Sequence, residues 1–211
     1  AGLEAKRAGI VIDLRGAGGT DIEAAGRLVG QFCPTGQFLF AFRDLRQQDL
    51  LVVKAAEHPA DAVPPIMVLV DRETTGAAEV LAAALHGALR SALLIGKTTA
   101  GDFTLREVLE VSGESIFAAT KVLDTADGAR YTGRSGITPS VPVAENERVT
   151  RDYEPPADPL DRRARLDIEE QDLAKRRRLR GDPDLERAVD ILTGLKSLNK
   201  PAAAVSSTDS L

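Results

Sequence analysis

The sequence predicts an α/β fold in which βαβ units build a mainly parallel sheet. Short apolar runs at residues 9–15, 66–70 and 92–95 have the length and β-branched content of buried parallel strands. Segments with apolar residues at helical spacing lie between these runs, and this alternation implies right-handed crossovers into one sheet. A chain of 211 residues is long enough to bury such a core without disulfide bonds.

The composition excludes several classes of protein. A single cysteine, Cys33, rules out an internal disulfide framework or a multi-cysteine zinc site, and His58 and His86 are too few for a histidine-rich metal centre. The net charge of −5 and the absence of Trp argue against nucleic-acid binding. No apolar run approaches the roughly 20 residues that a membrane span needs. We therefore expect no cofactor, no metal, no nucleic acid and no membrane span.

The first predicted strand runs into a glycine turn at residues 16–19. Asp21 can then cap a helix whose apolar residues recur at helical spacing until Pro34 ends the pattern. Residues 38–42 form a second candidate strand. The polar stretch at 43–62 is expected to be a strand edge and a loop.

An alanine-rich helix is predicted after the strand at 66–70, and the strand at 92–95 completes this unit. The pattern then changes. Residues 104–110 and 115–123 resemble paired strands, with a turn at Gly113 between them. We expect these residues to form a small β-rich part beside the parallel sheet.

We expect residues 1–148 to form the core. This region includes an extended edge segment at 137–143, because its prolines cannot donate to a central ladder. Residues 149–181 are densely charged and are predicted to be a linker or a helical insertion. The Asp-Pro pair that opens 182–198 starts a helix expected to pack on the core. Residues 199–211 are predicted to be a disordered tail.

Five motifs occur in an order that resembles one peptidase family. They lie at residues 9–19, 68–79, 96–101, 136–141 and 182–188. Together they resemble the S41 peptidases, the C-terminal processing (tail-specific) proteases, over about residues 3–195. The resemblance implies a crotonase/ClpP-like α/β core, with a small β-rich part and C-terminal helices.

Active members of that family use a serine nucleophile and a lysine base, and the resemblance implies that this chain has lost both. The family's serine lies three residues before a glutamate at the start of the alanine-rich helix. That glutamate matches Glu79, so the nucleophile position matches Gly76. The lysine position matches Asp102, and the position of an assisting glutamine matches Arg106. Because glycine has no side chain to attack a carbonyl, we expect a catalytically inactive domain.

The resemblance also implies a backbone site. The family's oxyanion hole uses an amide of the glycine turn, here Gly18 or Gly19, and the amide after the nucleophile, here Ala77. The turn is one residue shorter than is usual in the family. A helix N-terminus at Gly76 would still attract a carbonyl or carboxylate. We therefore expect the domain to bind a peptide or protein C-terminus without cutting it, or to act as a scaffold.

Two other functions stay open. An active serine-type endopeptidase could use a displaced nucleophile, for which Thr74, Thr75, Ser112 and Ser115 are candidates. Turn, strand and helix-capping roles suffice to explain these residues, and Thr75 in particular is expected to cap the helix. A structural or oligomerisation domain could use residues 160–180 as an assembly arm.

The family also suggests partners and a location. Its members usually carry a PDZ domain before this core, and they often act in the bacterial periplasm or envelope. No PDZ-like segment is visible in this sequence. We expect either a fragment of a longer protein or a branch without the PDZ domain, and a homo-oligomer is compatible with both.

Overall fold

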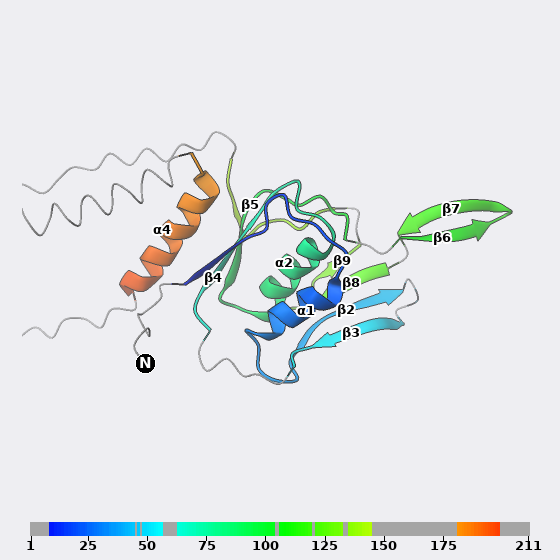
Figure 1. Ribbon diagram of the computed structural model, residues 1–211, viewed down its shortest axis with the longest axis horizontal. Helices are drawn as coiled ribbons and strands as arrows, with labels where there is room; N and C mark the ends of the chain where they lie inside the picture. Colours follow the sequence, from blue (N-terminus) through cyan, green and yellow to red (C-terminus); the bar gives the residue numbers. More distant parts are fainter. Residues whose placement is uncertain are drawn as a thin grey trace, which may run out of the picture.

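A computed structural model of the protein describes residues 9–44, 46, 48–56, 63–103, 106–119, 121–132, 135–144 and 181–198. These residues form two four-stranded sheets and a separate two-stranded hairpin, with helices between the two larger sheets and on one outer side (Figure 1). The expected linker at 149–181, except its last residue Gly181, and the expected tail at 199–211 lie outside the described residues.

The first sheet is parallel and confirms the predicted α/β core. It contains β1 (Ile10–Asp13), β4 (Ile66–Val70), β5 (Ala92–Gly96) and β10 (Val141–Pro142), in the order β1-β4-β5-β10. All five residues of β4 are buried, as expected for a central strand covered on both faces. The short β10 forms one edge, as the prolines of its segment predict.

The next two helices pack against each other, and both contact strands of a second sheet. In α1 (Ile22–Gly30), the carboxylate of Asp21 caps the helix by accepting a hydrogen bond from the Ala24 N–H at 2.8 Å. The helix α2 (Gly76–Ala88) is buried along most of its length and contacts β5 as well as strands of the second sheet. Its alanine-rich sequence suits this place, since small side chains let a helix pack closely on several sides at once.

The second sheet is antiparallel and has the order β3-β2-β8-β9. Its strands are β2 (Phe38–Asp44), β3 (Asp49–Lys54), β8 (Lys121–Thr125) and β9 (Arg130–Tyr131). The strand expected at 38–42 therefore exists but does not join the parallel sheet, and the expected loop at 43–62 contains β3. The rings of Phe40 and Phe42 are fully buried and meet edge to face, with centroids 6.3 Å apart.

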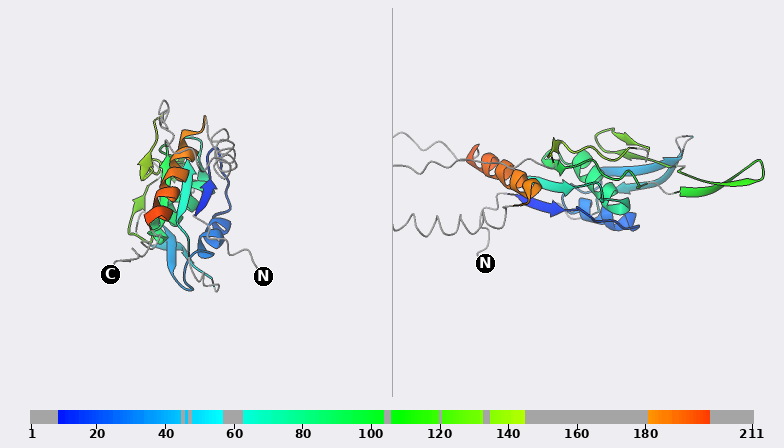
Figure 2. Two further views of the ribbon diagram at one scale, coloured as in Figure 1. Left: turned by 90° about the vertical axis from the view of Figure 1, so that its left-hand side faces the viewer. Right: turned by 90° about the horizontal axis from the view of Figure 1, so that it is seen from above.

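A separate hairpin of β6 (Arg106–Val111) and β7 (Glu114–Ala119) projects from the body in both Figure 1 and Figure 2. Its turn is formed by Ser112 and Gly113, with φ angles of 55° and 84°, as a two-residue type I′ turn requires. The turn at Gly113 was predicted. The single strand expected at 115–123 is instead two strands, β7 and β8, in different sheets.

The last described element, α4 (Pro183–Leu198), covers the other face of the parallel sheet (Figures 1 and 2). Successive residues of a strand point to opposite faces. In β4, Val68 accordingly packs in the cluster that contains α2, while Met67 and Leu69 pack with Ala188 and Leu192 of α4. In the described part of the chain, no helix is long and apolar enough to cross a membrane.

Candidate functional site

Three loops meet at the carboxyl edge of the parallel sheet, where α/β proteins commonly bind ligands. They are the glycine turn after β1, the N-terminus of α2 and the loop after β5. Backbone hydrogen bonds join them, from the Thr75 N–H to the Ala17 carbonyl at 2.9 Å and from the Ala100 N–H to the Thr74 carbonyl at 3.1 Å. The structure thus brings together Gly18, Gly19, Gly76, Ala77, Glu79 and Asp102.

Gly76 lies at the first turn of α2 and has no room for a side chain. Its φ angle is +56°, a conformation that strains residues with a Cβ. A Cβ atom there would lie 2.3 Å from the carbonyl oxygen of Gly19. The Gly76 N–H donates to the Asp102 carbonyl at 3.2 Å. A serine could therefore occupy this position only if the glycine turn moved.

The Ala77 N–H, one of the amides expected to form an oxyanion hole, already has a partner. It donates to the carbonyl of Gly19 at 2.8 Å. That carbonyl belongs to an exposed turn in which Gly19 itself has a φ angle of +123°. In this conformation the chain's own carbonyl occupies the N-terminus of α2, where a bound carbonyl or carboxylate would accept.

Glu79 is fully buried and fastens the loop after β5 to α2. Its carboxylate accepts hydrogen bonds from the Thr99 hydroxyl, from the Gly101 N–H at 2.7 Å and from the Asp102 N–H at 2.8 Å. The Thr99 hydroxyl oxygen in turn accepts from the Ile137 N–H at 2.8 Å. This network holds the backbone of Asp102 in place, while Asp102 itself is exposed.

Arg106 belongs to a different element from this hydrogen-bonded loop. It is the first residue of β6 and pairs with Ala119 of β7. The position that the family resemblance assigned to an assisting glutamine is therefore the base of the hairpin.

The candidate displaced nucleophiles have other roles. The Thr74 hydroxyl is buried, donates to the Leu14 carbonyl at 2.9 Å and accepts from the Asp71 N–H at 3.0 Å. Thr75 is the N-cap residue by position, but its side chain makes no capping hydrogen bond, so the predicted cap was wrong. Its hydroxyl lies instead beside Gly18, where an added Cβ would be 2.7 Å away.

The two candidate serines belong to the hairpin. Ser112 forms its turn, and the Ser115 hydroxyl donates to the Glu110 carboxylate at 2.5 Å. Both residues are exposed. Their observed roles are those of a turn residue and a cross-strand partner.

Asp71 is a residue of the site that the sequence analysis missed. Its Oδ1 accepts from the Gly16 N–H at 3.0 Å and the Glu73 N–H at 3.0 Å, and it lies 3.1 Å from the Thr74 hydroxyl. Burial alone would raise the pKa of Asp71, but these hydrogen bonds outweigh it and lower the pKa below its usual value. An aspartate directly after a buried strand, with a threonine three residues on, is the turn signal that could have identified it.

The remaining reactive side chains show structural roles. Cys33 is buried, and this burial raises the pKa of its thiol. The His86 ring nitrogen Nδ1 lies 3.1 Å from the Ala92 carbonyl, and His58 is outside the described residues. Within the described ranges, no group of His, Cys, Asp and Glu side chains could hold a metal ion.

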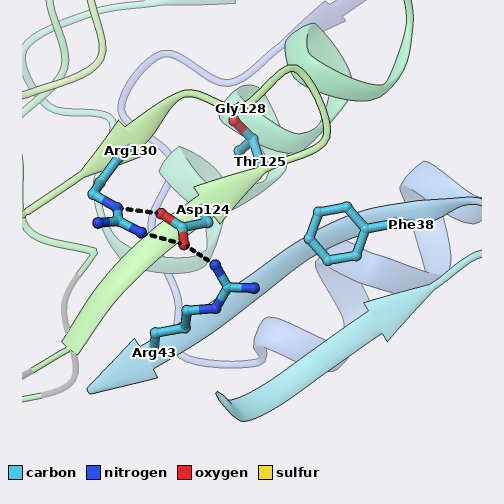
Figure 3. A pocket seen from close by; sticks show the side chains of 6 residues that line it. All are labelled: Phe38, Arg43, Asp124, Thr125, Gly128 and Arg130. Carbon is cyan, nitrogen blue, oxygen red and sulfur yellow. Dashed lines mark hydrogen bonds and ion pairs between the residues drawn. The ribbon is translucent and has the colours of Figure 1, made fainter. Parts of the chain in front are cut away.

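A pocket of about 220 Å³ opens on the antiparallel sheet (Figure 3), and none of the predicted site residues lines it. Phe38, Arg43, Asp124, Thr125, Gly128 and Arg130 line it. Its polar groups form a ladder across four strands, in which Arg43 bonds to Asp49 at 2.6 Å and to Asp124 at 2.7 Å, while Arg130 bonds to Asp124 at 2.7 Å. Hydrogen bonds from Arg130 first, and then the charge of Arg43, lower the pKa of Asp124 against the effect of burial. The charged side chains of this pocket therefore pair with one another across neighbouring strands, which stabilises the sheet.

The fold and the loops at its carboxyl edge define a peptidase-like α/β domain with a glycine turn facing a helix N-terminus. The family model for Peptidase family S41 matches residues 2–143. The chain belongs to peptidase family S41, which confirms the resemblance found in the sequence.

Known proteins agree with this assignment. The chain is 34% identical to the carboxy-terminal processing protease CtpA of Bacillus subtilis (strain 168) over 141 residues. These residues make up 66% of this chain and 29% of that protein. It is 28% identical over 134 residues to the chloroplastic C-terminal processing peptidase of Tetradesmus obliquus, covering 64% and 28%. The structure of the photosystem II D1 C-terminal processing protease superposes with a TM-score of 0.53 at 28% identity, covering 64% of this chain and 34% of that one. The chain thus spans less than a third of the length of the curated relatives it matches.

Proposed function

We propose that this S41 domain does not hydrolyse peptide bonds and acts by binding, either to a peptide or protein C-terminus or as a scaffold. One observation carries the proposal. Gly76 lies at the position expected for the nucleophile, and a Cβ added there would be only 2.3 Å from the Gly19 carbonyl oxygen. The position therefore lacks a hydroxyl, and the surrounding backbone is arranged for glycine.

The base position supports the same proposal. Asp102 replaces the family's lysine, and it follows a loop fastened by buried Glu79. A base needs a hydroxyl within hydrogen-bond reach, and glycine at 76 supplies none. The Thr74 hydroxyl is engaged with Leu14 and Asp71, which argues against a simple displacement of the nucleophile by two residues.

Binding of a C-terminal carboxylate at Gly18, Gly19 and Ala77 requires one rearrangement. The Ala77 N–H now donates a hydrogen bond to the Gly19 carbonyl at 2.8 Å, and this bond must break to free the amide. Glycine permits the backbone rotation that this needs. By family resemblance, we further propose that the whole protein includes a PDZ domain and works in the bacterial periplasm or envelope, with peptide C-termini as its partners.

A fluorophosphonate probe, which reacts with activated hydroxyls, tests the absence of catalysis. We expect no adduct on the full chain by intact-mass measurement, under conditions that fully label an active serine peptidase. A stoichiometric adduct at a defined Ser or Thr would overturn the proposal. If the adduct lay on Thr75, its loss in Thr75→Val would identify a displaced nucleophile.

Fluorescence anisotropy with labelled peptides then separates the two binding roles. A carboxylate site predicts saturable binding of a peptide with a free C-terminus and none of the same peptide amidated. Gly18→Leu would place a Cβ 2.7 Å from the Thr75 hydroxyl oxygen and so disturb the turn, and it should weaken that binding, whereas Gly36→Ala in an open turn should not. Equal binding of the free and amidated peptides would exclude a carboxylate site, and binding of neither peptide would leave only the scaffold role.

A further inference from the structure

The β6–β7 hairpin leaves its own apolar residues in solvent. Val108 is 62% exposed, Leu109 39% and Ile116 46%. Leu109 pairs directly with Ile116 on one face, while Val108, its neighbour in the strand, points to the other face. Figures 1 and 2 show the hairpin projecting from the body. Because an isolated two-stranded hairpin is only marginally stable in water, a further strand would stabilise it.

Among the strands that the structure describes, β6 and β7 pair only with each other, so each of them has one edge without a described partner strand. Val111 and Glu114 flank the two-residue turn, and their backbone groups are expected to hydrogen-bond to each other. Hydrogen-bonded and non-hydrogen-bonded pairs alternate along an antiparallel ladder. The backbone N–H and C=O groups of Arg106, Val108 and Glu110 are therefore directed outward from β6.

We propose that β6 pairs antiparallel with β6 of a second copy of this chain, about a two-fold axis at Val108. This register sets Arg106 of each copy opposite Glu110 of the other. Opposite charges that face each other across antiparallel strands attract. The exposed Val108 then lies opposite its own counterpart. The two hairpins become one four-stranded sheet.

The charge pattern favours a second copy over an unrelated strand. Arg106 and Glu110 lie two residues on either side of Val108, so the strand is complementary to itself when reversed. A two-fold interface requires this self-complementarity. The other edge lacks it, because the residues of β7 that point their backbone outward are Ser115, Phe117 and Ala119, none of which is charged.

The interface is small. Six residues of β6 bury less area than the roughly 1,200 Å² at the lower end of stable protein interfaces, so this contact alone predicts a weak, concentration-dependent dimer. The inference is independent of the proposed function, since the domain can pair in this way whether or not it cleaves peptides.

Sedimentation equilibrium of the full chain, from micromolar to near-millimolar concentration, tests the proposal. We expect a monomer–dimer equilibrium. Arg106→Glu and Glu110→Arg each place like charges opposite one another twice, and each should weaken the dimer at least about tenfold. The double variant Arg106→Glu/Glu110→Arg restores opposite charges and should recover the wild-type dissociation constant. The matched control, Glu114→Arg, makes the same charge change as Glu110→Arg on an exposed residue of β7 that is paired with Val111, and it should leave that constant unchanged.

A monomer at every concentration would overturn the proposal. So would a dimer indifferent to the two single reversals, a double variant that fails to recover, or a dimer weakened by Glu114→Arg. Cross-linking gives an independent measurement that avoids charge. Val108→Cys should form an intermolecular disulfide under mild oxidation, whereas Ser115→Cys should remain monomeric, and the reverse result would assign the contact to β7.

Discussion

At Gly76 the backbone restricts the chemistry as much as the missing side chain does. The φ angle of +56° and the 2.3 Å approach of a Cβ to the Gly19 carbonyl oxygen both favour glycine. The same carbonyl accepts from the Ala77 N–H. Restoring a serine and a lysine by Gly76→Ser and Asp102→Lys would therefore leave the glycine turn in the way of both the hydroxyl and the oxyanion amide.

Glu79 shows how a motif residue can be retained for its structural role. It accepts from the Thr99 hydroxyl and from two backbone N–H groups while fully buried. This loop contact is a structural reason for a glutamate three residues after Gly76.

The substitution Glu79→Gln measures that role. Glutamine keeps the shape but turns an NH₂ group toward backbone donors, so at least one buried donor loses its acceptor. We expect the free energy of unfolding to fall by about 2–4 kcal/mol in urea denaturation. The control Glu73→Gln changes an exposed carboxylate nearby and should cost less than about 0.5 kcal/mol. Equal losses in the two variants would contradict the network.

Among the elements, α4 is tied to β1 by a charged contact as well as by its apolar face. Arg15, just after β1, bonds through Nη1 and Nη2 to the two carboxylate oxygens of Asp182, both at 2.7 Å. Asp182 also accepts from the Leu185 N–H at 3.1 Å, as an N-cap residue does. The hydrogen bonds from Arg15 are the main cause that lowers the pKa of Asp182. The cap is visible in the sequence, but its partner 167 positions earlier is not.

This contact predicts a pH-dependent stability. Because the pKa of Asp182 is lower in the folded state, its contribution is complete above the unfolded value of about 3.9 and is lost as the pH falls through the folded value. Asp182→Asn keeps a cap but removes the charge. We expect it to reduce the free energy of unfolding by about 1 kcal/mol at pH 7, with the difference from wild type shrinking below about pH 4.

Urea denaturation at both pH values checks this, with Asp21→Asn as the control. Asp21 caps α1 in the same way, but its carboxylate is 66% exposed. The control should have a small effect at either pH. A difference for Asp182→Asn that persisted undiminished at low pH would show that the charged pair is not its cause.

Over the whole molecule, the parallel sheet is stabilised from two sides. One face carries α2 and the larger core, and the other carries α4 through a smaller cluster of Met67, Leu69, Ile95, Val143, Ala188 and Leu192. The helix α2 also contacts β2 and β8, so it joins the two sheets. The candidate site lies at the end of this shared helix, which makes its geometry depend on both sheets.

The contribution of α4 to the whole fold can be measured with two leucines of the same helix. Leu192 is 6% exposed and packs in the smaller cluster, whereas Leu198 is 82% exposed. We expect Leu192→Ala to lower the free energy of unfolding by about 2–4 kcal/mol. Leu198→Ala should change it by less than about 0.5 kcal/mol. Similar values for both variants would mean that α4 is not part of the cooperative unit.

Local patterns in the sequence were enough to predict the parallel strands, the helices α1, α2 and α4, and the turn at Gly113. They work because burial on both faces leaves continuous apolar runs, and because helical periodicity and turn residues are local signals. The order of the motifs identified the family and matched Gly76 to the position of the family's nucleophile. By itself, then, the sequence determined the α/β class, the S41 family and the absence of a serine at Gly76.

Only the tertiary structure decided which sheet each strand joins and what the backbone does at the site. The destination of β2 depends on pairing with β8, about 80 residues later, and no local pattern specifies such a partner. The occupied Ala77 amide depends on a φ angle of +123° at Gly19 and on the meeting of two distant loops. Glycine allows many conformations, so its sequence position shows where the chain can bend, and the surrounding packing selects the conformation.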